Sequence, residues 1–322
     1  MKVAVIGCGH WGKNLVRNFA ELDSLCAVSD SNETLAAQFS LRYEVPSVDF
    51  DAVLSSDCDG VVIATPAPLH ADLAKKAFVA GKHVYVEKPM AMTLDEADEI
   101  IEAGRKAGRH LMVGHLLQYH PVFARLRDMV KQGEFGELRY VYSNRLSFGK
   151  VRAEEDVVWS FAPHDISMIL SLVGQNVKTV RCEAADILQS GICDMASLHI
   201  CFENGIKGNV SCSWLHPYKE QKLVVIGEKG MAVFDDTMDW EQKLAVYEHE
   251  VDLQVSPPIL QNAEMRYEKV PEAEPLGAEC KYFLDLMAGH VDLLTDGFEG
   301  RRVLQVLAAA SESINSGSTI YA

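Results

Sequence analysis

This sequence of 322 residues has little positive charge for its size: 30 lysines and arginines stand against 46 aspartates and glutamates, and the formal net charge is −16. A surface of that sign repels phosphate backbones and anionic lipid headgroups, so we expect neither nucleic acid nor a membrane as a partner. No apolar run approaches the roughly 18 residues of a membrane-spanning helix. The opening residues, MKVAVIGCGHWGKN, also lack the apolar stretch of a signal peptide, so we expect a cytoplasmic protein.

Closely paired cysteines are missing as well. The eight cysteines include no C-x-x-C pair, and several stand inside apolar runs, which favours small buried side chains with reduced thiols over a disulfide framework. No repeat or low-complexity tract is visible, and apolar residues make up 48% of the chain, an ordinary value for a globular protein. At about 150 residues per domain, the length predicts two domains.

The first third of the chain alternates short β-rich runs with segments of helical period, a pattern that predicts a doubly wound parallel sheet with helices on both faces. The expected strands are 3–6, 25–29, a weak one at 45–48, 60–64, 83–86 and 111–114. Thr93 followed by Glu96 predicts a capping box at the start of a helix that ends near Gly108. This part of the chain is therefore expected to form an α/β domain.

The turn after the first expected strand has the sequence G-x-G-x-x-G. Gly7 permits a tight turn, Gly9 lets the backbone approach a pyrophosphate, and Gly12 lets helix and strand pack closely. Such a turn can be merely structural, but here it opens a strand–helix–strand unit, which is typical of a Rossmann dinucleotide site. We assign Gly7, Gly9, His10, Trp11 and Gly12 to this site.

Asp30 ends the second expected strand, 18 residues after Gly12. A carboxylate at this place can accept a hydrogen bond from an adenosine ribose hydroxyl. It would also repel the 2′-phosphate of NADP, and the adjoining residues 31–33 supply no arginine to bind that phosphate. The sequence therefore predicts NAD as the cofactor, with NADP less favoured.

Two later loops leave strands at the edge where such sheets bind ligands. The first loop carries Thr65, Pro66 and His70, which we assign to the cofactor site, although a histidine here can equally pack or cap a helix. The second loop carries Glu87 and Lys88. Either charge can be a solvated loop residue, but together at this edge they indicate a site.

Several motifs occur together in this first domain. They are Gly7 to Gly12, Ile63-Ala64-Thr65-Pro66 with His70, Ala80-Gly81-Lys82-His83-Val84, Glu87-Lys88-Pro89 and Glu96-Ala97. The combination resembles the Gfo/Idh/MocA oxidoreductase family. The resemblance implies an NAD(P)-dependent enzyme that acts on sugars, cyclitols or their derivatives. It also implies a cis Lys88–Pro89 bond and a second domain with a large, mainly antiparallel sheet, which often forms the oligomer interface.

The rest of the chain predicts an α+β domain dominated by strands. Runs rich in Val, Ile, Tyr and Cys lie at 138–148, 177–187, 195–203, 206–215, 221–227, 231–235 and 242–248, and helices are expected at about 121–132, 163–173, 276–290 and 299–314. Asn204-Gly205 is a hairpin signal, and residues 249–275 are expected to be irregular. The expected division is a dinucleotide-binding domain at 1–119 and a substrate-binding and oligomerisation domain at 120–322.

Members of the family commonly carry D-x-G-x-H-x-x-D at the start of a helix in the second domain. Here His164 is kept, but Ser160 replaces the first aspartate, Ala162 replaces the glycine and Ser167 replaces the last aspartate. Asp165 directly follows the histidine. We expect His164 at a helix N-terminus, where the dipole favours a neutral ring that can accept a proton. A capping histidine, and a purely electrostatic role for Asp165 at the helix end, stay open.

Other polar residues are candidates for substrate binding. They are Tyr119, Asn144, Arg145, Arg152 and Asp165. The two arginines could bind an anionic group such as a uronate or a diphosphate, but exposed arginines need no such explanation. The histidines where the chain enters the second domain do not have the spacing of a metal site, so we expect no metal.

Together these features predict a dehydrogenase that moves a hydride between the nicotinamide of NAD(P) and a carbinol carbon of a sugar or sugar derivative, for example a nucleotide sugar or a uronate. Lys88 would polarise the oxygen and His164 would take its proton. One alternative is a non-catalytic, dinucleotide-responsive regulatory protein of the same fold; another is an enzyme that oxidises its substrate only transiently. The strands outnumber the helices of the second domain, which predicts a homodimer or homotetramer.

Overall fold

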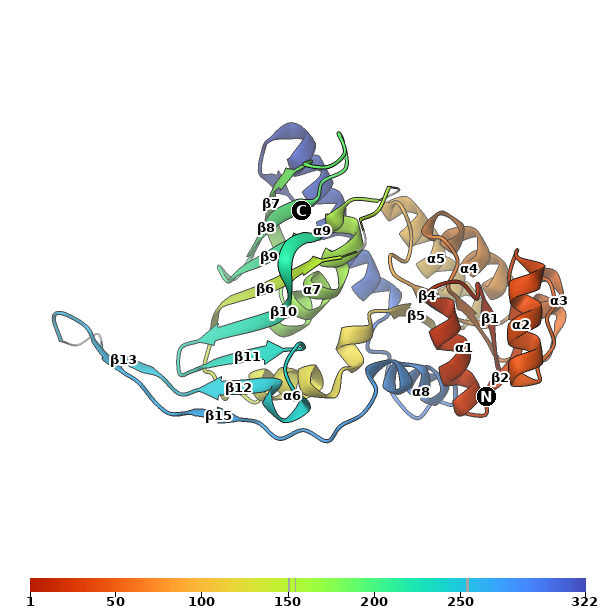
Figure 1. The fold of residues 1–322 in the computed structure, drawn as a ribbon, viewed down its shortest axis with the longest axis horizontal. Helices are drawn as coiled ribbons and strands as arrows, with labels where there is room; N and C mark the ends of the chain where they lie inside the picture. Colours follow the sequence, from red (N-terminus) through yellow and green to blue (C-terminus); the bar gives the residue numbers. More distant parts are fainter. Residues whose placement is uncertain (150, 154, 253–254) are drawn as a thin grey trace. The chain divides into compact units, whose positions relative to one another are not determined.

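The computed structural model describes residues 1–149, 151–153, 155–252 and 255–322 (Figure 1). The chain forms two compact units. Unit 1 consists of Met1–His120 and Ala273–Leu304, and unit 2 of Pro121–Glu272 and Gln305–Ala322. The division expected from the sequence, 1–119 and 120–322, differs from this because the segment Ala273–Leu304 returns to unit 1. Periodicity predicts that a helix has an apolar face, but not which core that face joins.

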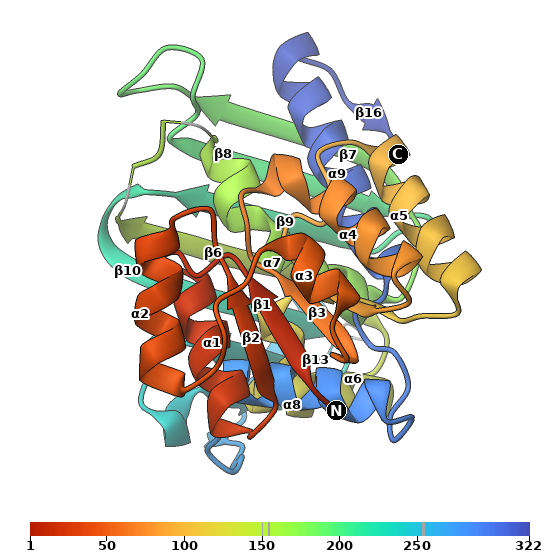
Figure 2. The same cartoon turned by 90° about the vertical axis from the view of Figure 1, so that its right-hand side faces the viewer.

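Unit 1 is a five-stranded parallel sheet in the order β2-β1-β3-β4-β5, which confirms the predicted Rossmann sheet (Figure 2). The strands are β1 (Val3–Ile6), β2 (Leu25–Ser29), β3 (Gly60–Ile63), β4 (His83–Glu87) and β5 (Leu111–Gly114). The helices are α1 (Gly12–Glu21), α2 (Glu33–Tyr43), α3 (Phe50–Ser55), α4 (His70–Val79), α5 (Leu94–Ala107) and α8 (Pro275–Met287), with short 3₁₀ turns η1 (Ala67–Leu69) and η2 (Leu116–Tyr119). The start of α9 (Gly297–Ser316) also belongs to unit 1.

Helices on both faces bury the strands of this sheet almost completely. Leu15 and Phe19 of α1 and Phe283 of α8 share one core, and the exposed fraction of each side chain is 0%. The capping box that begins α5 forms as predicted between Thr93 and Glu96, and the helix ends at a left-handed glycine. Local sequence signals and burial therefore agree over this unit.

The weak strand expected at 45–48 does not form. In its place a single bridge joins Val28 and Ser47, and the short helix α3 follows directly. The carbonyl oxygen of Pro46 accepts from the amide of Val28, and the amide of Val48 donates back to the carbonyl oxygen of Val28. Pro46 has no amide hydrogen for the next bond of the ladder, so the pairing does not extend toward the start of β2. The sheet of unit 1 therefore has five strands.

Unit 2 is built on a nine-stranded, mainly antiparallel sheet in the order β15-β12-β11-β10-β6-β9-β8-β7-β16, again as predicted. The strands are β6 (Leu138–Phe148), β7 (Val177–Ala185), β8 (Met195–Phe202), β9 (Lys207–Ser213), β10 (Leu215–Gly227), β11 (Met231–Asp235), β12 (Leu244–Tyr247), β15 (Met265–Tyr267) and β16 (Ile320–Tyr321). The helices are α6 (Pro121–Lys131), α7 (Val157–Val173) and the end of α9, with a 3₁₀ turn η3 (Trp240–Gln242). The predicted hairpin at Asn204-Gly205 joins β8 to β9, and Gly205 has a φ of +87°.

The segment 249–275, expected to be irregular, contains three short strands instead. β13 (Glu250–Asp252) pairs with β14 (Ile259–Gln261) as a separate ribbon, and β15 extends the main sheet beside β12. Pro257 and Pro258 lie in the connection between the two ribbon strands, where proline is compatible with a turn. The runs flanking these prolines are too short to stand out as strands in the sequence.

Candidate active site

The glycine-rich turn of unit 1 has the close backbone approaches that its sequence predicts. Gly7 has a φ of +91°, and a Cβ there would lie 2.6 Å from the carbonyl oxygen of Ala64. A Cβ on Gly12 would lie 1.9 Å from the carbonyl oxygen of Gly7. By contrast, no described atom comes within 4 Å of a Cβ built on Gly9. Two glycines thus close the turn, and the third faces open space.

Asp30 fastens this turn to the end of β2. Its carboxylate accepts hydrogen bonds from the amide of Cys8 (2.6 Å) and from the amide of Asn32 (2.8 Å). A carboxylate has about four lone-pair sites, so these two bonds leave it free to accept from a ribose as well. Asp30 therefore has a structural task beside the one predicted for it.

The loop after β3 is tied to the loop after β4 through His70. The ring of His70 is buried and lies 2.8 Å from the carbonyl oxygens of Thr65 and of Pro89, one on each ring nitrogen. Burial lowers the pKa of His70 more than these carbonyls raise it. Because both nitrogens face the backbone, the structure gives His70 a role in holding the two loops rather than in direct cofactor contact.

The side chain of Thr65, in the same loop as His70, lacks the hydrogen-bond partners that the His70 ring has. Its hydroxyl oxygen is buried and has no hydrogen-bond partner among the described residues. A buried hydroxyl without a partner costs free energy, so a ligand group at this strand end would relieve that cost.

Glu87 and Lys88 stand at the end of β4, and the Lys88–Pro89 bond is cis, as predicted. The Glu87 carboxylate accepts hydrogen bonds from the indole of Trp11 (2.7 Å) and from the hydroxyl of Tyr85 (3.2 Å). It therefore joins the strand end to the glycine-rich turn, rather than pointing freely at a cofactor. Lys88 is half-buried beside it.

In unit 2, His164 is not at a helix N-terminus, contrary to the expectation. Helix α7 begins at Val157, because the carboxylate of Asp156 caps the amides of Val158 (2.9 Å) and Trp159 (3.0 Å). Pro163, expected in the first turn, lies inside the helix. The helix dipole acts within about one turn of the end, so it does not control the ring of His164.

Asp165 forms a buried ion pair with Arg145 of β6. Their shortest contact, from Nε of Arg145 to Oδ2 of Asp165, is 2.5 Å, and Nη2 of the same guanidinium lies 3.3 Å from the other carboxylate oxygen. The hydroxyl of Ser143 also donates to this carboxylate. The side chain of Asp165 is 1% exposed and that of Arg145 12%. The two charges neutralise each other, so the Arg145 guanidinium is already engaged and is not offered to an anionic substrate. Asp165 lies inside α7, so it does not act at a helix terminus.

The remaining candidates have partners of their own. Asn144 lies on the opposite face of β6 from Arg145, since successive side chains of a strand alternate, and its amide donates to Glu220 (2.6 Å). Arg152 pairs with Glu155 (3.0 Å) on an exposed segment. The hydroxyl of Tyr119 is buried in unit 1, 2.7 Å from that of Thr295.

Comparison with known proteins decides the family. A family model described as an oxidoreductase family with an NAD-binding Rossmann fold, GFO_IDH_MocA, matches residues 1–115, and the model of the Gfo/Idh/MocA C-terminal domain matches residues 123–233. This chain belongs to the Gfo/Idh/MocA family. The family expected from the motifs is therefore confirmed, and with it an NAD-dependent oxidoreductase.

Individual relatives span nearly the whole Gfo/Idh/MocA chain. UDP-N-acetylglucosamine 3-dehydrogenase of Acidithiobacillus ferrooxidans is 29% identical over 94% of this chain and 94% of its own. A solved structure of that enzyme superposes with a TM-score of 0.87 at 26% identity, covering 98% of both chains. scyllo-Inositol 2-dehydrogenase (NAD(+)) of Bacillus subtilis is 28% identical over 74% of each chain.

The residues of unit 1 fit the NAD that the Gfo/Idh/MocA family binds. Gly9 faces open space beside the first turn of α1, where helix amides attract a pyrophosphate. Asp30 stands where an adenosine ribose is bound in such folds, and Thr65 offers a buried hydroxyl that lacks a partner within the described ranges. These residues would hold the cofactor.

Asp30 should also make this family member discriminate between cofactors. Two like charges about 4 Å apart repel by roughly 4 kcal/mol at an effective dielectric near 20, and salt reduces this further. We therefore expect kcat/KM with NAD to exceed that with NADP by at least about tenfold, and Asp30→Ser to narrow the ratio. Initial rates with both cofactors measure it; equal efficiency with NADP would contradict the expectation.

Two residues of the site were not predicted from the sequence. Tyr85 and Glu279 are completely buried in unit 1, and Tyr85 binds the Glu87 carboxylate. Tyr85 gave the usual signal of a β-strand residue. Glu279 gave one signal that could have been used, a single carboxylate on the apolar face of the helix expected at 276–290.

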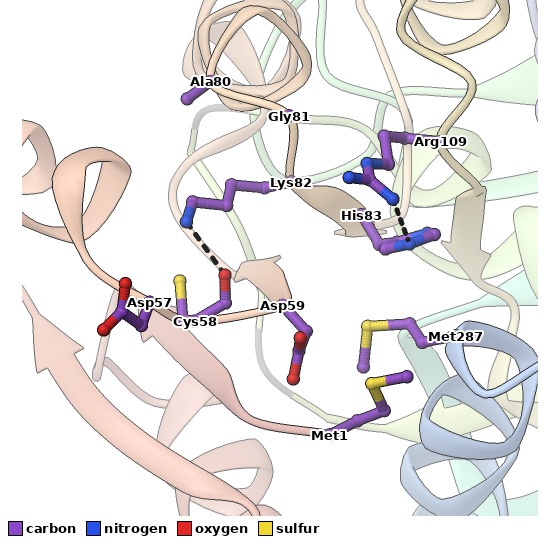
Figure 3. A pocket seen from close by; sticks show the side chains of 10 residues that line it. All are labelled: Met1, Asp57, Cys58, Asp59, Ala80, Gly81, Lys82, His83, Arg109 and Met287. Carbon is purple, nitrogen blue, oxygen red and sulfur yellow. Dashed lines mark hydrogen bonds between the residues drawn. The ribbon is translucent and has the colours of Figure 1, made fainter.

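A cavity of about 420 Å³ opens at the other edge of the unit 1 sheet, where the strands begin (Figure 3). Figure 3 shows His83, Lys82 and Arg109 among its lining residues, and Lys82 donates to the carbonyl oxygens of Ser56 and Cys58. This is the edge away from the glycine-rich turn. The cavity is therefore separate from the predicted cofactor site.

His83 at this cavity should make stability depend on pH. Its Nδ1 accepts a hydrogen bond from the amide of His110 (3.1 Å), and the Arg109 guanidinium lies 3.4 Å from its Nε2. Burial, then the charges of His110 and Arg109, lower the pKa of His83 from 6.5 to about 4. The folded state therefore favours the neutral ring, and the stability that this gives is complete above pH 6.5 and falls as the pH drops toward 4.

We expect this loss to be about 2 kcal/mol, since one pKa unit corresponds to about 1.4 kcal/mol and solvent in the cavity screens part of the effect. In His83→Asn, the amide oxygen can replace Nδ1 as an acceptor without titrating. Urea unfolding between pH 4 and 7 should show a smaller loss in this variant than in the wild type. His290→Asn, at an exposed site after α8, is the matched control, and equal slopes for all three proteins would refute the assignment.

The described residues contain neither a metal-binding cluster nor a membrane-spanning helix. In the described ranges, His, Cys, Asp and Glu side chains nowhere gather in the groups of three that hold a metal ion. Within the same ranges, each helix is too short or too polar to cross a bilayer.

Proposed function

We propose that this protein is an NAD-dependent dehydrogenase of a sugar derivative, with a nucleotide-linked N-acetylhexosamine as the first substrate to test. The observation that carries the proposal is the 29% identity with UDP-N-acetylglucosamine 3-dehydrogenase, which extends over 94% of this chain and so includes both units.

Two residues are proposed to act on the reacting hydroxyl group. When bound, NAD supplies a nicotinamide C4 that takes up or gives back the hydride. Lys88 places an ammonium where negative charge develops on the oxygen, and His164 takes the hydroxyl proton as the carbonyl forms. Glu87 and His70 hold the loops that carry this machinery, through their bonds to Trp11 and to two carbonyls. Asp165 is left out as a base because Arg145 and Ser143 already bind its carboxylate.

The test is a direct assay with purified protein. NAD is incubated with UDP-N-acetylglucosamine, UDP-glucuronate, free glucose and scyllo-inositol, and NADH is followed by absorbance. We expect turnover with the nucleotide-linked amino sugar. Binding of NADH without turnover of any substrate in a wider panel of sugars and cyclitols would favour the alternative, a dinucleotide-responsive regulatory protein. Tightly held cofactor with no net NADH would favour transient oxidation.

The protein is further proposed to be a homodimer or homotetramer in a reducing, cytoplasmic setting. α7 packs on one face of the unit 2 sheet, against β6, β8 and β9. On the other face, alternate side chains such as Thr179, Ser197 and Asn209 are half-exposed, a surface that a second copy would cover. The same face continues through Tyr142 of β6, Val224 of β10 and Val233 of β11, so it carries apolar as well as polar side chains. All eight cysteines are free thiols, which favours the cytoplasm.

Light scattering should give a mass at or above twice the 35.6 kDa of one chain. Arg181→Glu, at an exposed position on β7 of the same face, should shift the mass toward that of one chain, whereas Lys75→Glu on α4 of unit 1 should not. A wild-type mass of a single chain at micromolar concentration would rule the assembly out.

A further inference from the structure

A carboxyl group that no part of the proposed chemistry uses lies at the centre of unit 1. Glu279 of α8 is 0% exposed, as is Tyr85 of β4. Neither carboxyl oxygen of Glu279 has a hydrogen-bond partner among the described residues. An ionised carboxylate without partners is strongly disfavoured in such a place, so the group must be neutral or must share a proton.

The hydrogen bonds nearby show where that proton is useful. The hydroxyl of Tyr85 donates its one hydrogen to Glu87, 3.2 Å away, and the indole of Trp11 donates to the same oxygen at 2.7 Å. The hydroxyl oxygen of Tyr85 therefore still has lone pairs to accept a hydrogen bond. Glu279 lies on the same buried face of α8 as Phe283, which is one turn further along the helix, and the Phe283 ring packs edge-on against the Tyr85 ring with 5.7 Å between the centroids. Helix α8 therefore turns the face that carries Glu279 toward Tyr85. A protonated Glu279 is a donor of the kind that Tyr85 can accept.

The surrounding charges favour one negative charge shared unequally between the two carboxyls. Burial, followed by the charge of Glu87, raises the pKa of Glu279 well above its ordinary value, and the Tyr85 hydroxyl opposes this only in part. Burial also raises the pKa of Glu87, but Trp11, Lys88 and Tyr85 all stabilise its ionised form. The other titratable groups that interact with Glu279 are Tyr119 of η2 and Cys280 of α8, and neither offers a positive charge.

We propose that Glu279 is a positioning residue: as a neutral acid it donates to Tyr85, and Tyr85 in turn orients the Glu87 carboxylate that holds Trp11 of the glycine-rich turn. In this series of hydrogen bonds Glu279 donates to Tyr85 and Tyr85 donates to Glu87. The indole of Trp11 donates to the same Glu87 carboxylate. The negative charge stays on Glu87, next to Lys88. Gly114 makes room for this arrangement, since a Cβ there would lie 2.9 Å from the Tyr85 ring and 3.0 Å from the Glu87 carboxyl.

The proposal concerns NAD binding by unit 1 and does not depend on which sugar is the substrate. It is tested by the affinity for NADH, measured from nicotinamide fluorescence without any second substrate. Glu279→Leu keeps a side chain of similar volume but cannot donate, and we expect about tenfold weaker binding. Glu279→Gln can donate from its amide and is neutral, so it should restore the affinity to within about twofold of the wild type.

A double-mutant cycle tells this role from general damage to the fold. Trp11→Phe removes the indole N–H that donates to Glu87 at the other end of this series of hydrogen bonds, and it should also weaken NADH binding about tenfold. Because both changes break one connected path, the double variant Glu279→Leu with Trp11→Phe should bind no more weakly than Trp11→Phe alone. If Glu279→Leu does not fold, Tyr85→Phe takes its place in the cycle, with the same expectation.

Infrared spectroscopy at neutral pH tests the proton itself. The wild type should show the carbonyl stretching band of a protonated carboxylic acid whose proton exchanges slowly with solvent deuterium. Glu279→Gln should lack this band. Absence of this band in the wild type would overturn the proposal. So would additive effects in the cycle, or a glutamine variant as weak as the leucine variant.

Discussion

Replacing Lys88 by methionine should lower kcat by about two to three orders of magnitude, the largest loss expected from any single change in this protein. The carbinol oxygen gains negative charge as the hydride leaves, and a positive group held beside it stabilises that charge more than it stabilises the bound substrate. Removing one such group from a preorganised site costs about 10²–10³ in rate. Methionine keeps an unbranched side chain, one atom shorter than that of lysine, and removes the ammonium group.

Lys88→Arg is the matched control, because it keeps the positive charge while changing its shape. We expect it to retain more activity than the methionine variant. Steady-state kcat with NAD and the substrate found in the panel measures the effect, and NADH titration shows how much of it comes from the cofactor. If the methionine and arginine variants are equally active, charge at this position is not what Lys88 contributes.

Replacing His164 by alanine should lower kcat about a hundredfold or more, as expected for the loss of a general base. Oxidation cannot finish until the hydroxyl proton has left, and imidazole is the side chain that accepts a proton most readily near neutral pH. His164 is half-buried in α7 of unit 2, far along the chain from the glycine-rich turn of unit 1, so NADH affinity should stay nearly unchanged.

Chemical rescue gives this prediction a sharper test. Imidazole added to His164→Ala should recover part of kcat, but added to Lys88→Met it should recover nothing. His290→Ala, at an exposed site after α8, should leave kcat as in the wild type. Near wild-type turnover by His164→Ala would remove this residue from the mechanism and make Lys88 the proton acceptor.

Signals that lie close together in the sequence gave correct predictions. The turn at Gly7 could be predicted because its backbone geometry admits only glycine, with a φ of +91° and a carbonyl oxygen 2.6 Å from any Cβ. The strands of unit 1 were equally clear because both faces of the sheet are covered, so each strand is a short apolar run. The Asn204-Gly205 hairpin belongs to the same class, since a positive φ at Gly205 sets the turn locally.

Features that depend on distant partners could not be predicted in this way. The late start expected for α7, six residues beyond the true one, has a local cause instead: Pro163 is a common first helical residue, and the N-cap signal of Asp156, which binds amides only two and three residues away, was not used. Arg145 and Asp165 are 20 positions apart, and only the pairing of β6 with the face of α7 brings them together. The same holds for Glu279, which is 192 residues from Glu87.

The return of α8 to unit 1 sets an order of events while the protein is being made. Leu15 and Phe19 leave the ribosome early, yet the helix that covers them, with Phe283, follows only after all of Pro121–Glu272. At about 5–20 residues per second, synthesis of that intervening segment takes roughly 8–30 s. Throughout this time α1 has the strands of the sheet beside it but lacks the cover that α8 will provide, and the apolar surface left open is one that a chaperone on the nascent polypeptide must shield. Unit 2 can complete most of its sheet first, so the part of the protein that begins earliest is among the last to close.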